Sequence, residues 1–346
     1  MNTVSRRGFF GSVAAATSAA SSPAILATRA YADAAALVPR KLPVPNDNLG
    51  AYEPTLSADG NTIYFARFAN IGDKRVKGPS DIFVVHRIKQ GGEWPGTAED
   101  WSQPERLPDT VNSDSLDQEP WITDDGKTLY FMSGRKAEGV GPNGIWFTEK
   151  QANGVWSQAQ PVRGGDINLS GLISHCFLPL ELLGQPSVFT FVGIRPRSPG
   201  GSPSADIYTT RQVDGAWQPA ERYADRLLDS IANKCRFNVV TKADFTLGVV
   251  SVHDFGKFHT LLLVHYDPKS QQWKGPIVEP PFNDWAIDGA CPHFQAGGDR
   301  VIWAAGYDRG PDLISGSSGG RGGLYDLFWL PTSELIAYYK SRAGVG

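Results

Sequence analysis

A segment of thirteen residues occurs twice in the sequence and limits the possible folds more than any other feature. One copy runs from Glu53 to Phe65 and the other from Glu119 to Phe131, so the copies begin 66 positions apart (119 − 53). Each copy places an Asp-Gly pair between two stretches rich in β-branched and aromatic residues, which is typical of a β-hairpin with a tight turn. A hairpin that recurs at such an interval predicts an array of small, similar β-sheets.

The rest of the sequence divides into five units of this kind. Their inner strands are expected to begin near residues 53, 119, 175, 235 and 291. Four units have a Trp at the start of a predicted fourth strand, which we interpret as packing between units: Trp101, Trp156, Trp217 and Trp273. The abundant turn residues, Gly 38 and Pro 25, agree with many short strands.

The fifth unit lacks a fourth strand, whereas residues 38–44 form a strand-like segment without a unit of its own. Pairing this segment with the last unit would close a ring and cover the sheet edges that an open array exposes. The sequence therefore predicts an all-β, five-bladed β-propeller with four-stranded blades, closed by an N-terminal strand that completes the last blade.

The repeated hairpin resembles the WD40-like (PD40, TolB-type) β-propeller repeat. The resemblance depends on Pro-x-x-x-x-Asp-Gly-x-x-[Leu/Ile]-Tyr-Phe followed by Asp-Ile-Phe/Tyr, which is clear in the first two units and partial in the third and fifth. The fourth unit has no Asp-Gly turn. This resemblance implies a propeller fold and often a binding role, and it implies no fixed catalytic residue.

Residues 1–32 have the pattern of a twin-arginine signal peptide. The segment Ser5–Phe10 contains Arg6 and Arg7, an Ala-rich stretch follows, and Ala30-Tyr31-Ala32 offers a cleavage site. We therefore expect export to the periplasm or secretion, with residues 33–346 forming a single propeller domain. No other stretch is long and apolar enough to span a bilayer, and the net charge of −3 does not favour nucleic acid. We expect a monomer.

Polar residues recur where the five inner strands begin, which in a propeller is one mouth of the central channel. Long loops on the same face are predicted at 68–80, 134–142, 194–204, 252–257 and 306–323. The predicted ligand-binding residues are Glu53, Glu119, His175, Arg236, Arg67, Arg135, Arg195, His253 and Asp308. Arginines among them would hold a small polar or anionic ligand by charge-assisted hydrogen bonds.

Three other interpretations of the same residues remain open. The polar groups in the channel could form hydrogen bonds and ion pairs with one another, without binding a ligand. A metal ion, the cofactor considered, would use thiolates and imidazoles, with His175, Cys235, Cys291 and His293 as the candidates.

The last interpretation is a glycan-active hydrolase that uses Glu53 and Glu119 as its acid and base, with Asp288 in a supporting role. Five-bladed glycosidases usually carry Asp, Asp and Glu on successive blades, whereas this sequence has Glu, Glu and His. The main expectation is consequently a protein that binds a small polar ligand or a protein partner at the channel mouth. A hydrolase and a metal-binding propeller are the alternatives.

Overall fold

The computed structural model describes most of the chain after its N-terminal segment. The described residues are 37–44, 49–69, 73–89, 91–141, 143–168, 173–180, 188–196, 203–254, 257–283, 288–306 and 325–345. Residues Ala35–Gly346 form one compact unit. The predicted signal peptide lies outside the described residues, so it stays a prediction.

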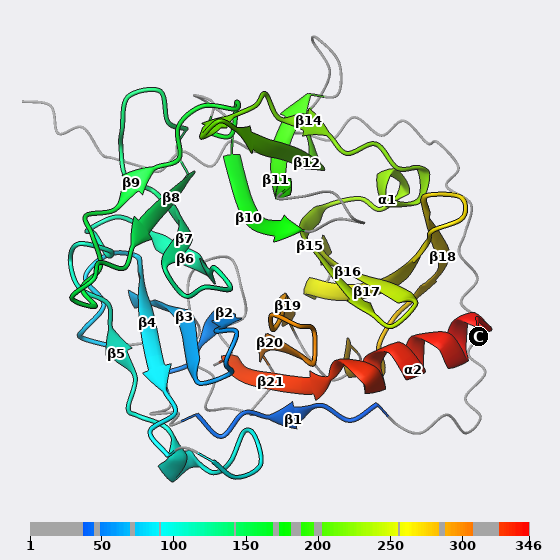
Figure 1. Cartoon of the computed structure of the whole chain (residues 1–346), viewed down its shortest axis with the longest axis horizontal. Coiled ribbons are helices and arrows are strands. Elements are labelled where there is room, and N and C mark those ends of the chain that lie inside the picture. Colours follow the sequence, from blue (N-terminus) through cyan, green and yellow to red (C-terminus); the bar gives the residue numbers. More distant parts are fainter. Residues whose placement is uncertain are drawn as a thin grey trace, which may run out of the picture. The chain divides into compact units, whose positions relative to one another are not determined.

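Five antiparallel β-sheets surround the centre of the molecule, which confirms the predicted five-bladed propeller (Figure 1). Blades 1 and 2 consist of β2 (Tyr52–Leu56), β3 (Thr62–Phe68), β4 (Ser80–His86) and β5 (Glu105–Arg106), then β6 (Asp117–Ile122), β7 (Thr128–Ser133), β8 (Gly144–Glu149) and β9 (Gln160–Pro161). Blade 3 consists of β10 (Ile173–Leu180), β11 (Val188–Pro196), β12 (Pro203–Val213), β13 (Ala216–Trp217) and β14 (Glu221–Arg222). Blades 4 and 5 consist of β15 (Lys234–Lys242), β16 (Phe245–Asp254), β17 (Lys257–Asp267) and β18 (Gln272–Val278), then β19 (Asp288–Phe294), β20 (Arg300–Gly306), β21 (Tyr325–Pro331) and β1 (Arg40–Lys41).

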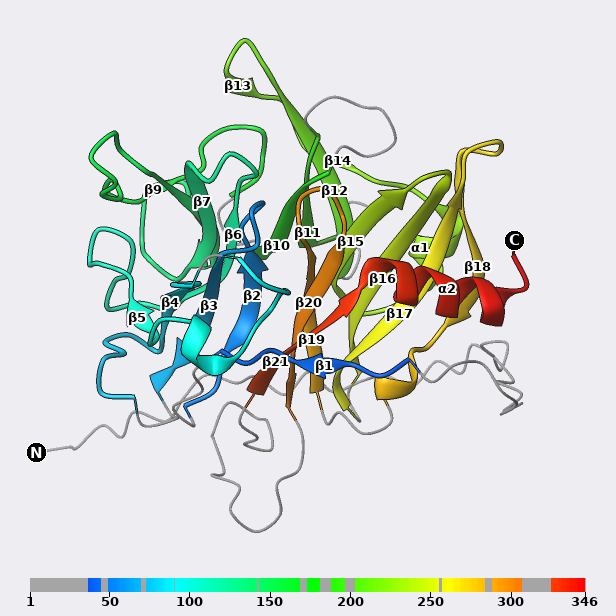
Figure 2. The same ribbon diagram turned by 60° about the horizontal axis from the view of Figure 1, so that its bottom comes forward.

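Helical segments are few among the described residues. They comprise two 3₁₀ turns and two α-helices: Ala98–Asp100, Pro281–Asn283, α1 (Arg226–Ser230) and α2 (Thr332–Ala343). None of the described helices has the length and apolar character needed to cross a bilayer. Helix α2 follows β21 directly and lies near β18, beside the outer part of blade 4 (Figure 2).

The predicted closure of the ring is confirmed. Strand β1 pairs with β21 through Arg40 opposite Trp329 and Lys41 opposite Phe328, and the two strands run side by side in both ribbon views (Figure 2). Next to this short pairing, the N–H of Leu42 donates to the carbonyl of Leu327 at 2.8 Å. Because Leu42 is only 1% exposed, the closing segment adds apolar packing as well as hydrogen bonds.

The repeated Asp-Gly hairpins form as the sequence predicts. In the first, the N–H of Gly60 donates to the carbonyl of Ser57, and the Asp59 carboxylate accepts from the Ser57 hydroxyl at 2.5 Å and the Asn61 N–H at 3.0 Å. Gly60 has a φ of 73°, which glycine adopts without a steric penalty. The fourth blade reaches a tight turn without glycine, because Ala243 takes a φ of 53° there.

The recurring Trp residues pack between blades. Trp156 of blade 2 meets Tyr64 of blade 1 edge to face, with ring centroids 6.2 Å apart. The indole N–H of Trp273 in blade 4 donates to the hydroxyl of Tyr223, which follows the outer strand of blade 3, at 3.2 Å. These contacts bury apolar surface where neighbouring sheets meet, so each blade is stabilised by the next.

Several predicted boundaries were wrong. The outer strands of blades 1 and 2 are shorter than predicted, because Trp101 and Trp156 make only isolated bridges to Arg87 and Lys150. Conversely, β11, β12, β16 and β17 extend into the ranges 194–204 and 252–257 that were predicted to be loops.

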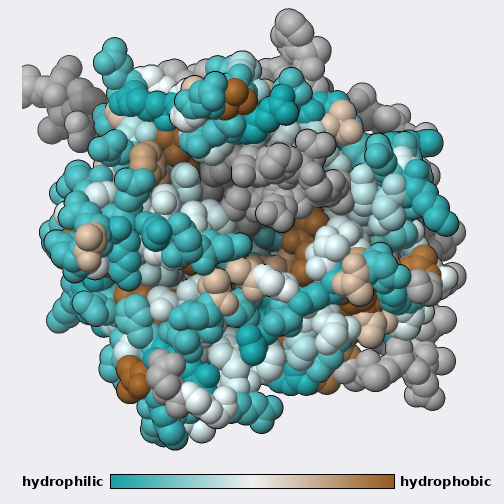
Figure 3. Space-filling model, viewed as in Figure 1, coloured by the Kyte–Doolittle hydropathy of each residue, from teal (hydrophilic) through white to brown (hydrophobic). Residues whose placement is uncertain are grey.

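The face of the molecule seen in Figure 3 is mostly hydrophilic, and hydrophobic residues appear on it in small separate groups. The large apolar side chains exposed among the described residues come from four distant segments: Val38, Ile88, Val155 and Val213. This pattern directs attention to the polar residues near the centre rather than to an apolar surface.

Candidate functional site

The five inner strands are all irregular near their beginnings. The pairing of each inner strand with its neighbour shifts between Tyr52 and Thr55, Gln118 and Trp121, His175 and Leu178, Lys234 and Arg236, and Ala290 and His293. At three of these irregularities a non-glycine residue has a left-handed backbone: Glu53 (φ 52°), Glu119 (φ 54°) and Cys291 (φ 55°). Each is followed by a proline. Such conformations are uncommon for residues with a side chain and concentrate at functional sites.

Glu53 and Glu119 lie on adjacent inner strands and are linked directly. The backbone N–H of Glu119 donates to Oε2 of Glu53 at 2.7 Å. Both residues are buried, with 3% and 4% of their surface exposed. The structure therefore brings together the two carboxyl groups that the sequence singled out.

Burial raises the pKa of Glu53 well above its ordinary value, because an ionised carboxylate loses its hydration there. Electrostatic interactions with the neighbouring Cys291 and Glu119 raise this pKa further, whereas the Arg236 charge and the Glu119 N–H lower it. A carboxyl group whose pKa is raised in this way is better suited to act as a general acid.

Arg236 is buried beside this pair and contacts the fifth blade. It is 1% exposed, and its Nη1 donates to the carbonyl of Cys291 at 3.2 Å. Two residues further along β15, the amide of Asn238 donates to the Pro292 carbonyl at 2.6 Å. Blade 4 thus holds the irregular backbone at Cys291 in place with two polar side chains.

His293 connects three inner strands and serves a structural purpose. Its Nδ1 accepts from the N–H of Leu56 at 3.3 Å, which leaves Nε2 to donate to the hydroxyl oxygen of Thr55 at 3.1 Å. Thr55 in turn accepts the N–H of Ile122 at 3.3 Å. Burial, with a contribution from Arg236, lowers the pKa of His293 to about 3, so the imidazole is neutral. Since both ring nitrogens have partners, His293 is not available to bind a metal ion.

The cysteines do not form a metal centre in the described part of the chain. Cys235 and Cys291 are free thiols, and Cys235 donates to the carbonyl and hydroxyl oxygens of Ser251, both at 3.2 Å. Among the described residues, no three His, Cys, Asp or Glu side chains lie close enough to share a metal ion. The metal interpretation therefore gains no support from Cys235, Cys291 or His293.

Arg67 is buried and anchors a loop, and its predicted role in ligand binding stays a prediction. Its Nε donates to the Gly50 carbonyl at 3.1 Å, and its Nη1 pairs with Asp73 at 2.9 Å. Burial alone would raise the pKa of Asp73, but hydrogen bonds from Arg75 and Arg67 lower it to about 2. The guanidinium also lies over the ring of Phe83, 5.0 Å from its centroid. These contacts fix the loop between β3 and β4.

Arg135 has a comparable environment in blade 2 and also lines a pocket. Its guanidinium pairs with Asp117 at 3.1 Å and lies over the rings of Phe131 and Trp146. In the paired positions of β7 and β8, Phe131 lies opposite Trp146, as Phe65 lies opposite Phe83 in blade 1.

The remaining predicted residues cannot be assigned contacts. His175, Arg195, His253 and Asp288 lie within described strands, but their side chains lie outside the described part, and Asp308 lies outside it altogether. Their predicted roles stay predictions.

The sequence-based prediction missed Thr55 and Asn238. Thr55 and Asn238 lie two residues after Glu53 and Arg236, just as His293 lies two residues after Cys291. Because side chains alternate along a strand, residues 55, 238 and 293 form a second polar layer. In the sequence, the interval of two residues from Glu53 and Cys291 was the feature that could have indicated this layer.

The comparisons with known proteins concern the fold. Neither a protein-family model nor a curated protein sequence matches the chain. An α-L-arabinofuranosidase from Lactobacillus brevis has a similar structure, with a TM-score of 0.52 and 11% identity over 81% of this chain and 91% of that one. A β-xylosidase gives a TM-score of 0.51 and 9% identity over 85% of this chain and 94% of that one. At such identities the likeness establishes a shared five-bladed fold.

The resemblance to WD40-like, TolB-type repeat proteins was wrong. The two solved structures quoted above are five-bladed propellers of glycoside hydrolases instead. The Asp-Gly hairpin misled the assignment because it meets a local requirement, a tight turn between two strands, that is not confined to one propeller family.

Proposed function

We propose that the chain is a glycan-active hydrolase whose acid and base chemistry is centred on Glu53 and Glu119. The observation that carries this proposal is a pair of buried carboxyl groups on adjacent inner strands, joined by a 2.7 Å hydrogen bond from the backbone of one to the side chain of the other. Glycosidases in general use two carboxyl groups, of which one protonates the leaving oxygen.

The two carboxyl groups take different roles in this proposal. Glu53 acts as the general acid, because its raised pKa favours the protonated form. Glu119 acts as the second carboxylate, which activates water or attacks the sugar. Arg236 supplies positive charge beside Glu53, and Asp288, which begins β19, is the remaining candidate for a supporting carboxylate.

The structural comparisons favour hydrolysis over the binding role that we expected from the sequence. The two proteins with the highest structural similarity quoted above are an arabinofuranosidase and a β-xylosidase. This chain departs from the Asp, Asp and Glu pattern of five-bladed glycosidases, since the described equivalents are Glu53, Glu119, Arg236 and Cys291. We therefore propose glycoside hydrolysis as the reaction class, and the sugar specificity is to be measured.

Hydrolysis of p-nitrophenyl α-L-arabinofuranoside and β-D-xyloside, alongside a panel of other p-nitrophenyl glycosides, tests the proposal. We expect Glu53→Gln and Glu119→Gln each to reduce kcat/KM by about 100-fold or more, the scale of acid–base catalysis. Glu105→Gln, on the exposed outer strand β5, is the matched control and should keep full activity.

Thermal unfolding of each variant shows whether a loss of activity reflects a loss of folding. Folded Glu53→Gln and Glu119→Gln proteins with unchanged turnover would refute the assigned roles. A folded wild-type protein that hydrolyses none of the glycosides, yet is thermally stabilised by one of them, would instead restore the binding interpretation.

A further inference from the structure

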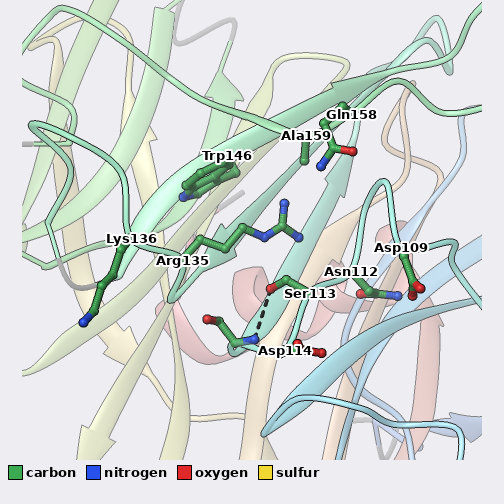
Figure 4. Close-up of a pocket in the computed structure, with 10 residues that line it drawn as sticks. Asp109, Asn112, Ser113, Asp114, Arg135, Lys136, Trp146, Gln158 and Ala159 are labelled. Carbon is green, nitrogen blue, oxygen red and sulfur yellow. Dashed lines mark hydrogen bonds between the residues drawn. The ribbon is translucent and has the colours of Figure 1, made fainter.

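A pocket of about 610 Å³ lies away from the carboxyl pair, between blades 1 and 2. It is formed by the connection from β5 to β6, the residues that follow β7, and the segment before β9 (Figure 4). Neither Glu53 nor Glu119 lines it. Its volume is in the range of sites that bind small molecules.

The Arg135 guanidinium lies in the middle of this pocket and is held firmly. In Figure 4 it projects between Ser113 and Asp114 on one side and Gln158 and Ala159 on the other. Its Nη2 donates to the Val111 carbonyl and, at 3.1 Å, to the Asp117 carboxylate. The guanidinium lies over the rings of Phe131 and Trp146, whose centroids are 5.4 and 5.2 Å away. A positively charged group fixed in this way is already organised to receive a ligand.

Two buried hydrogen-bond donors of the residues lining the pocket have no partner among the described residues. These donors are Nε of Arg135 and the indole N–H of Trp146. Lys136 is exposed nearby and adds positive charge. Buried donors without partners are unfavourable, so a ligand with acceptor oxygens would restore lost hydrogen bonds.

Both sides of the pocket supply groups that suit hydroxyls. Asp114 is exposed and contributes a carboxylate, Gln158 contributes an amide and Ser113 a hydroxyl. Trp146 is only 6% exposed, and Arg135 covers its ring, so the pocket offers no open aromatic face on which a neutral sugar could stack. These features together favour a ligand that combines a carboxylate with hydroxyl groups.

We propose that this pocket binds a sugar acid of the uronic acid class, with the ligand carboxylate on Arg135 and the ligand hydroxyls toward Asp114 and Gln158. The site is distinct from the proposed hydrolytic centre and needs no catalysis. Its test therefore succeeds or fails independently of the activity of Glu53 and Glu119.

Isothermal titration calorimetry of the full chain with D-glucuronate, D-galacturonate, D-glucose and acetate tests the proposal. We expect a uronate to bind, and glucose and acetate each to bind at least about tenfold more weakly, because each lacks one half of the recognised chemistry. Arg135→Lys keeps the charge beside Asp117 but removes the planar fork, and should weaken binding about tenfold.

Trp146→Phe keeps the ring and deletes the indole donor, so it tests the pocket even if Arg135→Lys does not fold. It should weaken uronate binding about threefold. Lys127→Gln, in the exposed turn of the same blade, is the matched control and should bind normally. Equal binding of glucose and glucuronate, no binding of either uronate, or uronate binding that both pocket variants leave unchanged, would overturn the proposal.

Discussion

The Glu53 carboxyl is the residue where burial has the clearest chemical consequence. Folding removes it from water and places Cys291 and Glu119 nearby, so the protonated form is favoured in the folded protein and its pKa rises. The left-handed backbone at Glu53 and the Glu119 N–H fix its position. The protein thus retains an unfavourable backbone conformation and an unfavourable site for a charge at one residue, as functional sites often do.

This pKa shift predicts how stability depends on pH. A raised pKa stabilises the folded state fully below the ordinary Glu value of 4.5, and this contribution is lost as the pH rises toward the folded-state pKa. Glu53→Gln cannot ionise, so the melting temperature of the variant relative to wild type should increase as the pH rises above 4.5. Thermal unfolding across this range measures the difference, with Glu105→Gln as the exposed control. A difference that does not change with pH would contradict the assignment.

At the scale of elements, the hairpin turns show how one backbone requirement leads to different packing. Gly60 and Gly126 occupy equivalent turns with φ values of 73° and 68°. A Cβ atom on Gly60 would lie 3.1 Å from Nε2 of Gln295 and 3.3 Å from Nε1 of Trp94, whereas one on Gly126 would meet nothing within 4 Å. The first turn therefore also packs against neighbouring segments.

Alanine substitutions at these two glycines separate the two effects. Gly126→Ala should lower the free energy of unfolding by about 1 kcal/mol, the typical cost of a left-handed backbone for a residue with a side chain. Gly60→Ala should cost more, because crowding adds to the same conformational cost. Chemical denaturation of both variants provides the comparison. Equal losses in the free energy of unfolding would show that the neighbouring side chains move aside without an energetic cost.

Local patterns in the sequence were sufficient to predict the turns, the blade count and the position of Glu53 and Glu119, because each depends on spacing along the chain. The structural roles of Arg67 and His293 could not be predicted from such local patterns. Arg67 is held by Gly50 and Asp73, and His293 by Thr55 and Leu56, so their roles depend on contacts across loops and blades. The sequence showed polar residues gathered near the centre, but only the structure distinguishes residues that stabilise the ring from those left for chemistry.

On the scale of the whole molecule, closure of the ring depends on a short segment near the N-terminus. Strand β1 spans only Arg40–Lys41, and Lys41 pairs with Asp326 at 2.7 Å. The next residue, Leu42, is fully buried in the cluster shared by blades 5 and 1. Apolar burial and a partly exposed ion pair therefore both contribute to closure, and they are expected to differ in strength.

Leu42→Ala and Lys41→Gln compare these contributions. Loss of the buried leucine should reduce the free energy of unfolding by about 2–5 kcal/mol. Lys41→Gln should cost no more than about 1 kcal/mol, because half of the lysine side chain is exposed to solvent. Denaturant titration measures both values, and a larger effect for Lys41→Gln would contradict the view that packing closes the ring.

The pairing of β1 with β21 also has a consequence for the order of events during folding. Arg40 meets Trp329, so the contact that completes the ring joins residues separated by almost the whole chain. Contacts of such long range form slowly, because a large loop must close first. The ribosome must therefore synthesise the chain as far as β21 before the circle can be completed, and until then β1 has no partner strand.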